Sequence, residues 1–403
     1  MKEGYKKTEV GVIPDDWEVK SIGKISEVKT GGTPSRNNED YWENGTIPWM
    51  SSGEVNKKRV HYTKEFITEL GLKHSNTSLL PKNTIMMALN GQGKTRGMVA
   101  LLEIESTCNQ SLAGIITNKL VNPYYVYYYL ESLYEKIRAI TGDGARNGLN
   151  LALIREIKVG IPPLKEQEKI ADILSTADCQ IYDTEMLIEK CQELKKGLMQ
   201  RLLTKGIGHT EFKKTEVGEI PVEWEVKKLD VICEFLDGMR KPIKSSDREN
   251  MKGIIPYYGA SGIIDWVNDY IFDEELILLG EDGENLKSRN VPLAFRVNGK
   301  CWVNNHAHVL RCKNANIGFV TEVLESKDYT SYVIGSAQPK LTQSQCKKIL
   351  IQVPSLKEQE RIAQILASID NEIEGYKNRK QNLKKLKKGL MQQLLTGKIR
   401  TSI

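Results

Sequence analysis

The chain has 403 residues, a formal net charge of +6, a hydrophobic content of 40% and a charged content of 27%. This length predicts two or three domains, and the composition is that of a globular protein and excludes extended disorder. No apolar run approaches the roughly 18 residues of a membrane span, and no apolar signal core follows the N-terminus, so we expect a cytoplasmic protein with no membrane contact. The seven cysteines form no C-x-x-C pair, which favours free thiols over a disulfide framework or a common zinc module.

The first recognisable element is a motif near the N-terminus. Residues 7–20 are KTEVGVIPDDWEVK, and residues 214–227 are KTEVGEIPVEWEVK, with eleven of fourteen positions identical. A motif that returns after 207 residues indicates an internal repeat. We expect Trp17 and Trp224, which hold the same place in the two copies, to be buried anchors of a shared frame.

The block from residue 21 to 160 predicts mixed α and β structure. Thr84–Leu89 and Met98–Ile104 are short, apolar and bounded by Gly, Asn or Pro, as strands are. Tyr124–Ile137 predicts a helix with an aromatic face, and Asn122 with the proline that follows it predicts an ordinary helix start.

A long shared segment follows at residues 161–213. It contains PPLKEQEKIADIL (162–174) and LKKGLMQRLLT (194–204), in which apolar residues are spaced by three and four. This spacing predicts one long helix from Glu166 to Leu203 with a seam like that of a coiled coil. The glycines that follow, Gly206 and Gly208, are expected to end the helix.

The block from residue 214 to 352 starts with the repeated motif but then differs from the first block. Strands are predicted at Glu275–Leu279 and Val291–Phe295. Two unlike blocks in identical frames indicate one scaffold that carries two specificities.

The last segment, residues 353–403, repeats the long helix 192 residues after its first copy. It contains PSLKEQERIAQIL (354–366) and LKKGLMQQLLT (386–396), and Gly397 is expected to end the helix. Residues 375–403 hold nine Lys and Arg and no Asp or Glu, so the excess positive charge of the chain lies here. Such a cluster favours a polyanion or an acidic partner nearby, although a solvated helix face would have the same composition.

These elements together predict an α+β fold with a pseudo-twofold internal repeat. Two α/β domains would be bridged by two long antiparallel, coiled-coil-like helices, because each apolar stripe needs a partner to cover it, and the chain termini would be neighbours. The predicted parts are a shared opening segment (1–20), a first domain (21–160), a central helix with linker (161–213), a second motif with the second domain (214–352) and a C-terminal helix (353–403).

With these repeats the chain resembles the specificity subunits of type I restriction-modification enzymes. The resemblance rests on the duplicated helices, the duplicated G-x-IP-x-x-WEV motif and the order of motifs in the two blocks, and it covers essentially the whole chain. The motifs of the first block are GGTPSR (31–36), YWENGTIPW (41–49), GQGKTRG (91–97) and NQSLAGI (109–115), and those of the second are YYGASGIIDWV (257–267), LLGEDG (278–283) and VNNHAHVL (303–310).

The resemblance implies a function in DNA recognition. The two α/β domains would be target recognition domains that each recognise one half of a split sequence in double-stranded DNA. The long helices would set the unread gap and bind two methyltransferase subunits, to which the restriction and translocase subunits are added. This chain would catalyse nothing, and S-adenosylmethionine, ATP and Mg²⁺ would be bound by the partner subunits.

Candidate DNA contacts are polar residues in loops of the two blocks. Gln is suited to adenine, Arg and Lys to guanine or phosphate, and small hydroxyl residues to phosphate. The candidates are Thr33, Ser35, Arg36, Gln92, Lys94 and Arg96 in the first block and Arg240, Lys241, Asn304, Asn305 and His306 in the second.

Other interpretations of these motifs remain open from the sequence. Residues 88–95 fit a relaxed phosphate-loop pattern, A-x4-GKT, which would indicate a nucleotide-binding protein, but a strand-like run follows where a helix is required, and a plain surface hairpin fits equally. Cys301, His306, His308 and Cys312 could suggest zinc, although a structural polar network is the simpler interpretation. The long helices alone would also suit an assembly scaffold that recognises no sequence.

Overall fold

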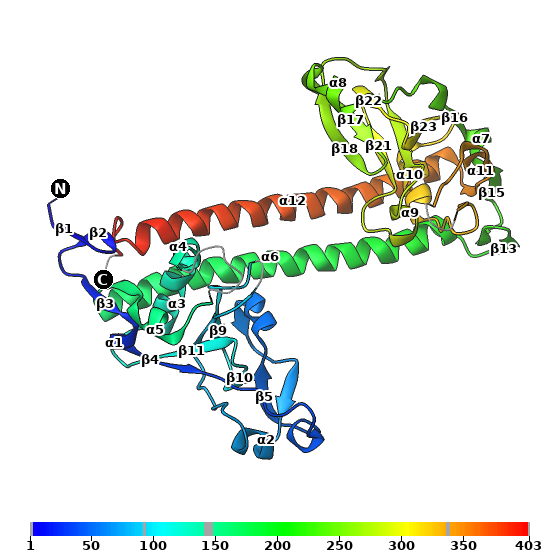
Figure 1. Ribbon diagram of the computed structural model, residues 1–403. Coiled ribbons are helices and arrows are strands. Elements are labelled where there is room, and N and C mark those ends of the chain that lie inside the picture. Colours follow the sequence, from blue (N-terminus) through cyan, green and yellow to red (C-terminus); the bar gives the residue numbers. More distant parts are fainter. Residues whose placement is uncertain (1–2, 92–93, 141–147, 336–338, 402–403) are drawn as a thin grey trace. The chain divides into compact units, whose positions relative to one another are not determined.

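The computed structural model describes residues 3–91, 94–140, 148–335 and 339–401, which form two compact units (Figure 1). Unit 1 comprises Met1–Thr184 with Arg379–Ile403, and unit 2 comprises Glu185–Asn378. Two long helices, α6 (Leu164–Lys205) and α12 (Leu356–Leu394), each begin in one unit and end in the other. Within the described ranges, no helix is both long and apolar enough to cross a membrane.

Unit 1 is built on a mixed five-stranded sheet of order β4-β11-β8-β9-β6, beside a three-stranded sheet of order β10-β5-β7. Its strands are β1 (Tyr5–Thr8), β2 (Gly11–Pro14), β3 (Glu18–Ser21), β4 (Ser26–Thr30), β5 (Ile47–Met50), β6 (Arg59–Val60), β7 (Glu65–Ile67), β8 (Ile85–Ala88), β9 (Val99–Leu102), β10 (Thr107–Cys108), β11 (Leu112–Thr117) and β12 (Lys158–Ile161). Its shorter helices are α1 (Ile22–Ile25), α2 (Glu69–Lys73), α3 (Pro123–Ser132), α4 (Tyr134–Ile140) and α5 (Leu151–Glu156), with 3-10 turns η1 (Glu39–Tyr41) and η2 (Ser52–Lys57).

Unit 2 is built on a four-stranded sheet of order β16-β23-β20-β21, beside a second sheet of order β18-β17-β22-β19. Its strands are β13 (Phe212–Thr215), β14 (Gly218–Pro221), β15 (Glu225–Lys228), β16 (Cys233–Phe235), β17 (Lys252–Gly259), β18 (Gly262–Val267), β19 (Phe272–Asp273), β20 (Leu276–Gly280), β21 (Ala294–Val297), β22 (Lys300–Val303), β23 (Ala307–Cys312) and β24 (Leu350–Val353). Its shorter helices are α7 (Leu229–Ile232), α8 (Ser245–Glu249), α9 (Asn285–Ser288), α10 (Ile317–Ser326) and α11 (Gln343–Lys347), with the 3-10 turn η3 (Asp237–Met239).

The main sheets of the two units share one topology. Strands β4-β11-β8-β9 and β16-β23-β20-β21 have the same order, and every neighbouring pair is antiparallel. The predicted internal repeat of two α/β domains is therefore confirmed. Two local predictions were inaccurate. The predicted helix at Tyr124–Ile137 is two helices, α3 and α4, separated at Leu133, and β21 starts at Ala294, three residues later than predicted.

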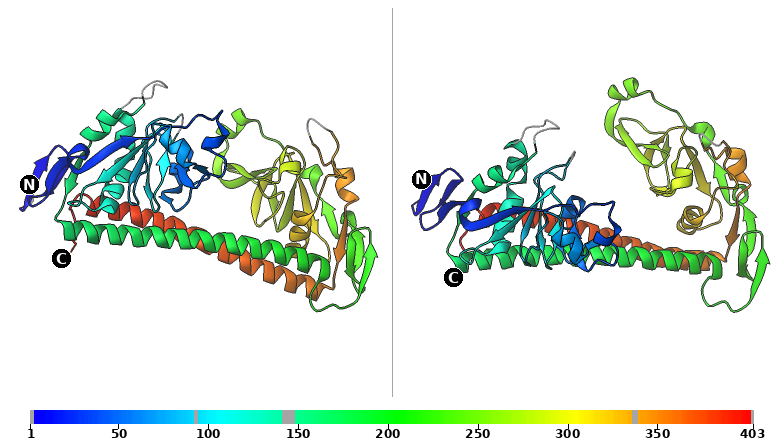
Figure 2. Two further views of the ribbon diagram at one scale, coloured as in Figure 1. Left: turned by 90° about the horizontal axis from the view of Figure 1, so that it is seen from below. Right: turned by 60° about the horizontal axis from the view of Figure 1, so that its bottom comes forward.

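The long helices pair in antiparallel fashion within each unit, as predicted (Figures 1 and 2). In unit 1, Lys387 of α12 contacts Asp178 of α6. In unit 2, Lys195 of α6 contacts Asp370 of α12. The apolar seams lie between the helices or under the domains, since Ile170 and Ile362 are fully buried.

α6 ends at Lys205, directly before Gly206 as predicted, whereas α12 ends at Leu394, three residues before the predicted Gly397. Gly206 and Gly397 have φ angles of +64° and +67°, a left-handed conformation that a residue with a β carbon adopts only with strain. A β carbon at Gly206 would also lie 2.7 Å from the Trp224 ring. Because Gly206 lies so close to the Trp224 ring, a side chain has no room at this turn, which leads from α6 into the second copy of the shared motif.

A glutamate, fully buried in unit 1 and 13% exposed in unit 2, ties the shared motif to the start of each long helix. In unit 1, Glu166 is completely buried and accepts a hydrogen bond from Nε1 of Trp17 at 3.2 Å and two from Arg400 at 2.8 Å. In unit 2, Glu358 accepts from Nε1 of Trp224 at 3.0 Å and contacts His209. Both tryptophans are buried, which confirms their predicted role as anchors.

The two ends of the chain meet in unit 1. The Tyr5 hydroxyl donates to the Gly397 carbonyl oxygen at 2.9 Å, and Arg400 pairs with Asp16. Figure 2 shows the β1–β2 hairpin beside the end of α12. The prediction of neighbouring termini is confirmed.

Removing the charge of Glu166 should destabilise unit 1. Glu166→Gln removes the buried one of the two carboxylates that pair with Arg400 and leaves only Asp16, and we expect a loss of about 1–3 kcal/mol in the free energy of unfolding, measured by urea denaturation. Glu168→Gln is the matched control, because this side chain is exposed two residues further along the helix, and it should change stability by less than about 0.5 kcal/mol. Equal losses for the two variants would contradict a structural role for Glu166.

Candidate nucleic-acid interface

Three loops of unit 1 gather at one end of its main sheet. The register pairs Thr30 with Ala113, Ala88 with Leu112, and Met87 with Val99. The end of β4, the start of β11, the end of β8 and the start of β9 therefore all lie at the same end of the sheet. The loops 31–36, 89–98 and 109–111 extend from this end, which we call the loop end of unit 1. The opposite end of the sheet leads into α1 and α3, which belong to the shared frame.

Unit 2 has the same arrangement. Phe235 pairs with Leu310, Gly280 with Ala307, and Leu279 with Ala294. The loops 236–241, 281–293 and 304–306 therefore form the loop end of unit 2. The turns before β11 and β23 match in detail, because Asn109 accepts a hydrogen bond from the Ser111 backbone and Asn304 accepts one from the His306 backbone.

The loop end of unit 1 joins residues from distant parts of the chain. The Thr33 hydroxyl donates to Oε1 of Gln110 at 2.6 Å, and the backbone of Leu89 donates to the Ser111 carbonyl. Between these loops lies a polar hollow of about 260 Å³, lined by Ser52, Gly53, Asn90, Gly91, Thr95 and Ser111. Gln110 was missed as a candidate, although its position in NQSLAGI, directly before an apolar strand, marks it as a loop residue.

The other candidate DNA contacts of the first block differ in how exposed they are. Ser35 and Lys94 are exposed. Arg36 stacks over the Trp42 ring at 3.7 Å and forms two hydrogen bonds with Glu65, while half of its side chain stays exposed. Arg96 is only 8% exposed, which leaves little of the residue accessible for the direct DNA contact predicted for it. Gln92 lies outside the described residues.

The candidate DNA contacts of the second block likewise include both exposed and buried residues. Lys241 and Asn305 are exposed, and His306, half exposed, has its Nδ1 at 2.9 Å from Asp282. Asn304 is 5% exposed and holds the turn. These four residues nevertheless lie in loops of one loop end, as a common site requires.

Arg240, which was also predicted as a DNA contact, has its side chain engaged in contacts within the loop end. Its guanidinium is 13% exposed and donates to Glu281 at 2.6 Å and to the Ala307 carbonyl at 2.7 Å. These bonds connect loop 236–241 to β23 and to loop 281–293. The sequence could not reveal this role, because Glu281 and Ala307 are 41 and 67 residues away.

A buried histidine completes this framework. His308 is fully buried, its Nδ1 lies 2.7 Å from Oδ2 of Asp237, and its Nε2 donates to the Leu341 carbonyl at 2.7 Å. Burial opposes ionisation of Asp237, but its contacts with His308, the Val309 backbone and Arg240 outweigh burial and lower its pKa. His308 thus belongs to a structural network, as the alternative to zinc proposed, and no metal-binding cluster occurs among the residues that the structure describes.

The glycine-rich stretch at 88–97 connects two strands. β8 and β9 form an antiparallel hairpin, and β9 begins at Val99. A phosphate loop must open a helix whose N-terminus faces the phosphates. The structure therefore gives no support to the phosphate-loop interpretation, because a strand and not a helix follows the stretch.

Comparison with known proteins decides the family. A family model described as the type I restriction modification DNA specificity domain matches residues 14–192 and 221–385, one match for each recognition domain with its long helix. The chain belongs to this family. The MjaVIII specificity subunit of a type I restriction enzyme from Methanocaldococcus jannaschii is 28% identical over 428 residues, which cover 99% of this chain and 96% of that protein.

Two solved structures share the fold of this specificity-family chain. The S subunit of a type I restriction-modification system from M. genitalium has a TM-score of 0.64 at 18% identity and covers 100% of both chains. A chain from a structure that describes complex assembly and conformational transition of a type I system has a TM-score of 0.56 at 16% identity, with 96% of this chain and 99% of that chain covered. The predicted pair of α/β domains with long central helices is thus the fold of the family.

The loop end of unit 2 should lose stability in acid through Asp237. Because the folded state lowers the pKa of this carboxyl below its usual value of 3.8, its contribution is complete above about pH 4 and disappears as the pH falls through the lowered value. The difference in unfolding temperature between the wild type and Asp237→Asn, followed by circular dichroism, should therefore shrink below about pH 4. A difference that does not change with pH would contradict this assignment.

Proposed function

We propose that the chain is the DNA-recognition subunit of a type I restriction-modification complex and that each loop end recognises one half of a bipartite target in double-stranded DNA. The observation that carries this proposal is the presence of two loop ends of the same topology and different residues on a duplicated frame. A single-site binder or a plain scaffold would have no need for two such sets of loops.

Exposed polar residues of the loop ends supply the chemistry of base recognition. Unit 1 offers Thr33, Gln110 and Lys94, and unit 2 offers Lys241, Asn305 and His306, with Ser35 nearby in unit 1. Amide side chains can form two hydrogen bonds with adenine, and lysine can contact guanine or phosphate. The buried residues Arg96, Arg240 and Asn304 would shape the loops that carry these groups.

The long helices offer matching surfaces for two copies of one protein partner. Leu194 and Leu386 occupy the same position in the repeat and are 54% and 55% exposed, and Leu164 and Leu356 are 43% and 50% exposed. Exposed leucines at equivalent positions favour the binding of two identical subunits. We infer that these subunits are methyltransferases and that restriction and translocase subunits join the same complex.

Catalysis and cofactor binding would belong to those partners. We place S-adenosylmethionine, ATP and Mg²⁺ on the methyltransferase and translocase subunits, and the whole complex in the cytoplasm. Two observations support this placement of the cofactors. The chain belongs to the type I DNA specificity family, and the strands on either side of its phosphate-loop-like sequence form a hairpin.

Exchange of one recognition domain should change one half of the target. We expect that replacing residues 21–143 with the corresponding block of another family member alters the half-site recognised by unit 1 and leaves the other half unchanged, because the two loop ends have separate sheets and cores. The measurement is methylation of a DNA library by the reconstituted complex. A change in both half-sites would contradict modular recognition, and equal methylation of all duplexes by the wild type would favour the scaffold.

Lengthening the helices should lengthen the unread gap. Four residues inserted in α6 after Thr184 and four in α12 after Asn378 add about 6 Å at 1.5 Å per residue. At about 3.4 Å per base pair, the preferred gap should grow by one or two base pairs. The preferred gap is measured with duplexes that differ only in the number of base pairs between the half-sites. An unchanged gap in a folded variant would show that the helices do not set the spacing.

A further inference from the structure

Each unit contains a lysine that binds two carboxylates from two different elements. In unit 1, Nζ of Lys387 lies 2.7 Å from Glu131 and 2.8 Å from Asp178. In unit 2, Nζ of Lys195 lies 2.7 Å from Asp370 and 3.3 Å from Glu322. We call these two sets the Lys–Asp–Glu triads.

The triads are equivalent in the internal repeat. Lys195 and Lys387 are 192 residues apart, as are Asp178 and Asp370, and the two glutamates are 191 residues apart. The lysine and the aspartate belong to the shared helices, whereas the glutamate is contributed by the recognition domain. Counted from the capping asparagines, Glu131 is the ninth residue of α3 and Glu322 the sixth of α10, so the two unlike domains supply the same residue type from positions about one helical turn apart.

Each triad joins the recognition domain to both long helices. Glu131 lies at the end of α3, Asp178 in α6 and Lys387 in α12. In unit 2 the corresponding elements are α10, α12 and α6.

A second contact fixes the other end of the same domain helix. The backbone of Asn122, which caps α3, donates to the side chain of Gln167 in α6 at 2.8 Å. The backbone of Asn316, which caps α10, donates to Gln359 in α12 at 2.9 Å. The start of each domain helix is therefore attached to one long helix, and the triad attaches the end of α3 and the middle of α10 to both long helices.

Burial of the charged groups makes the triads favour one position of each recognition domain along the long helices. The Lys387 side chain is 7% exposed and Glu131 is 20% exposed. Taking such charges out of water is costly unless they are well paired. Burial raises the pKa of Glu131, but Lys387 and Lys58 outweigh burial and lower it below the usual range, so this carboxyl is ionised in the folded state. A shift of the domain along the helices would leave buried charges unpaired.

We propose that the two Lys–Asp–Glu triads are positioning residues that fix the orientation of each recognition domain on the helix pair and thereby restrict the complex to one gap length between the half-sites. This inference rests on the proposed function, because a gap has meaning only for a bipartite target. The triads act through the helices and touch no base.

The two triads are held with different strength. Asp178 also accepts from the Tyr128 hydroxyl at 2.8 Å, and Glu131 also pairs with Lys58. In unit 2, Asp370 is 45% exposed, and burial raises the pKa of Glu322 in spite of Lys195.

The test is a gap-length scan with the complete complex. Duplexes that carry both half-sites and gaps from two base pairs shorter to two longer than the optimum are methylated by the reconstituted complex. We expect the wild type to prefer its optimum about tenfold over each neighbouring gap. Lys195→Met combined with Lys387→Met should reduce this preference to about twofold while single-base changes in either half-site are still discriminated.

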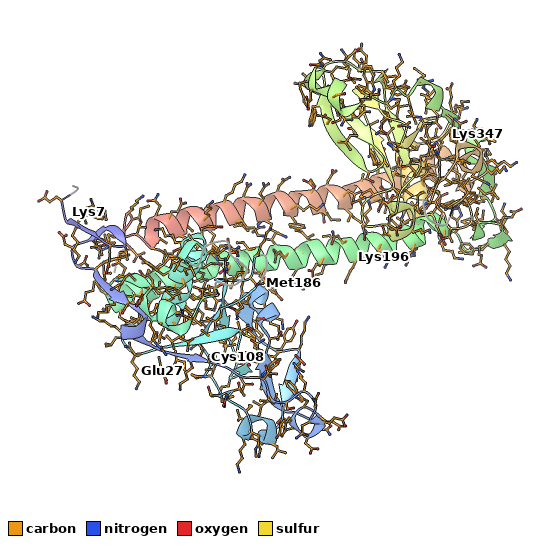
Figure 3. The ribbon with its side chains drawn as sticks, in the orientation of Figure 1. Lys7, Glu27, Cys108, Met186, Lys196 and Lys347 are labelled. Carbon is orange, nitrogen blue, oxygen red and sulfur yellow. The ribbon has the colours of Figure 1, made fainter. Side chains whose placement is uncertain are left out.

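Matched controls separate the triads from general charge effects. Lys196, labelled in Figure 3, and Lys388 are exposed neighbours of the triad lysines and equivalent to each other in the repeat. Lys196→Met combined with Lys388→Met should keep the tenfold preference. Lys195→Arg combined with Lys387→Arg retains the charges and should restore most of the selection that the methionine pair loses.

The results of this scan distinguish failure of the triad proposal from failure of the proposed function. A folded methionine double variant that selects its gap as sharply as the wild type would overturn the proposal. If that variant does not fold, Asp178→Asn combined with Asp370→Asn is used, and undiminished selection in this pair would overturn the proposal in the same way. A wild-type complex that methylates all gap lengths equally would instead refute the proposed function.

Discussion

An apolar stripe along a long helix is stable in water only when another surface covers it. α6 has 42 residues and α12 has 39, and both carry isoleucines and leucines at helical spacing. Ile170, Ile188 and Ile373 are among those that are buried. Burying one such side chain is worth about 1.5–3 kcal/mol, so antiparallel pairing of the two stripes is strongly favoured. The recognition domains depend on this pairing, because α3 and α10 make their polar contacts with the paired helices.

The contacts of the shared segments and long helices are repeated in the two units, whereas those of the loop ends differ. In both units a tryptophan donates to a glutamate, a helix cap donates to a glutamine, and a lysine pairs with two carboxylates. At the loop ends the residues diverge: Thr33 contacts Gln110 in unit 1, whereas His308 and Asp237 form a buried pair in unit 2. This division keeps the geometry of the frame constant while the two loop ends carry different side chains.

The parts of the structure that the sequence predicted are those governed by local or repeated patterns. The spacing of Ile170 and its successors predicted the long helices, the repeated Trp17 motif predicted the buried anchors, and Asn122 before proline predicted the start of α3. Strand ends were less accurate, as at β21, because apolar runs do not define them to a residue.

The candidate site was predicted only in outline, because its contacts join residues far apart in the chain. Arg240 is paired with Glu281 and with a carbonyl 67 residues away, and Lys387 with a glutamate 256 residues away. Sequence type alone could not distinguish Arg240 and Arg96, which are buried, from Lys241 and Lys94, which are exposed.

The most direct measurement of the central claim is the adenine methylation pattern of a methylation-free host that expresses this chain with its methyltransferase subunit. The account predicts methylation of a single two-part motif with a fixed gap, absent when the chain is omitted. Methylation without a shared two-part motif, or the same pattern without the chain, would contradict it.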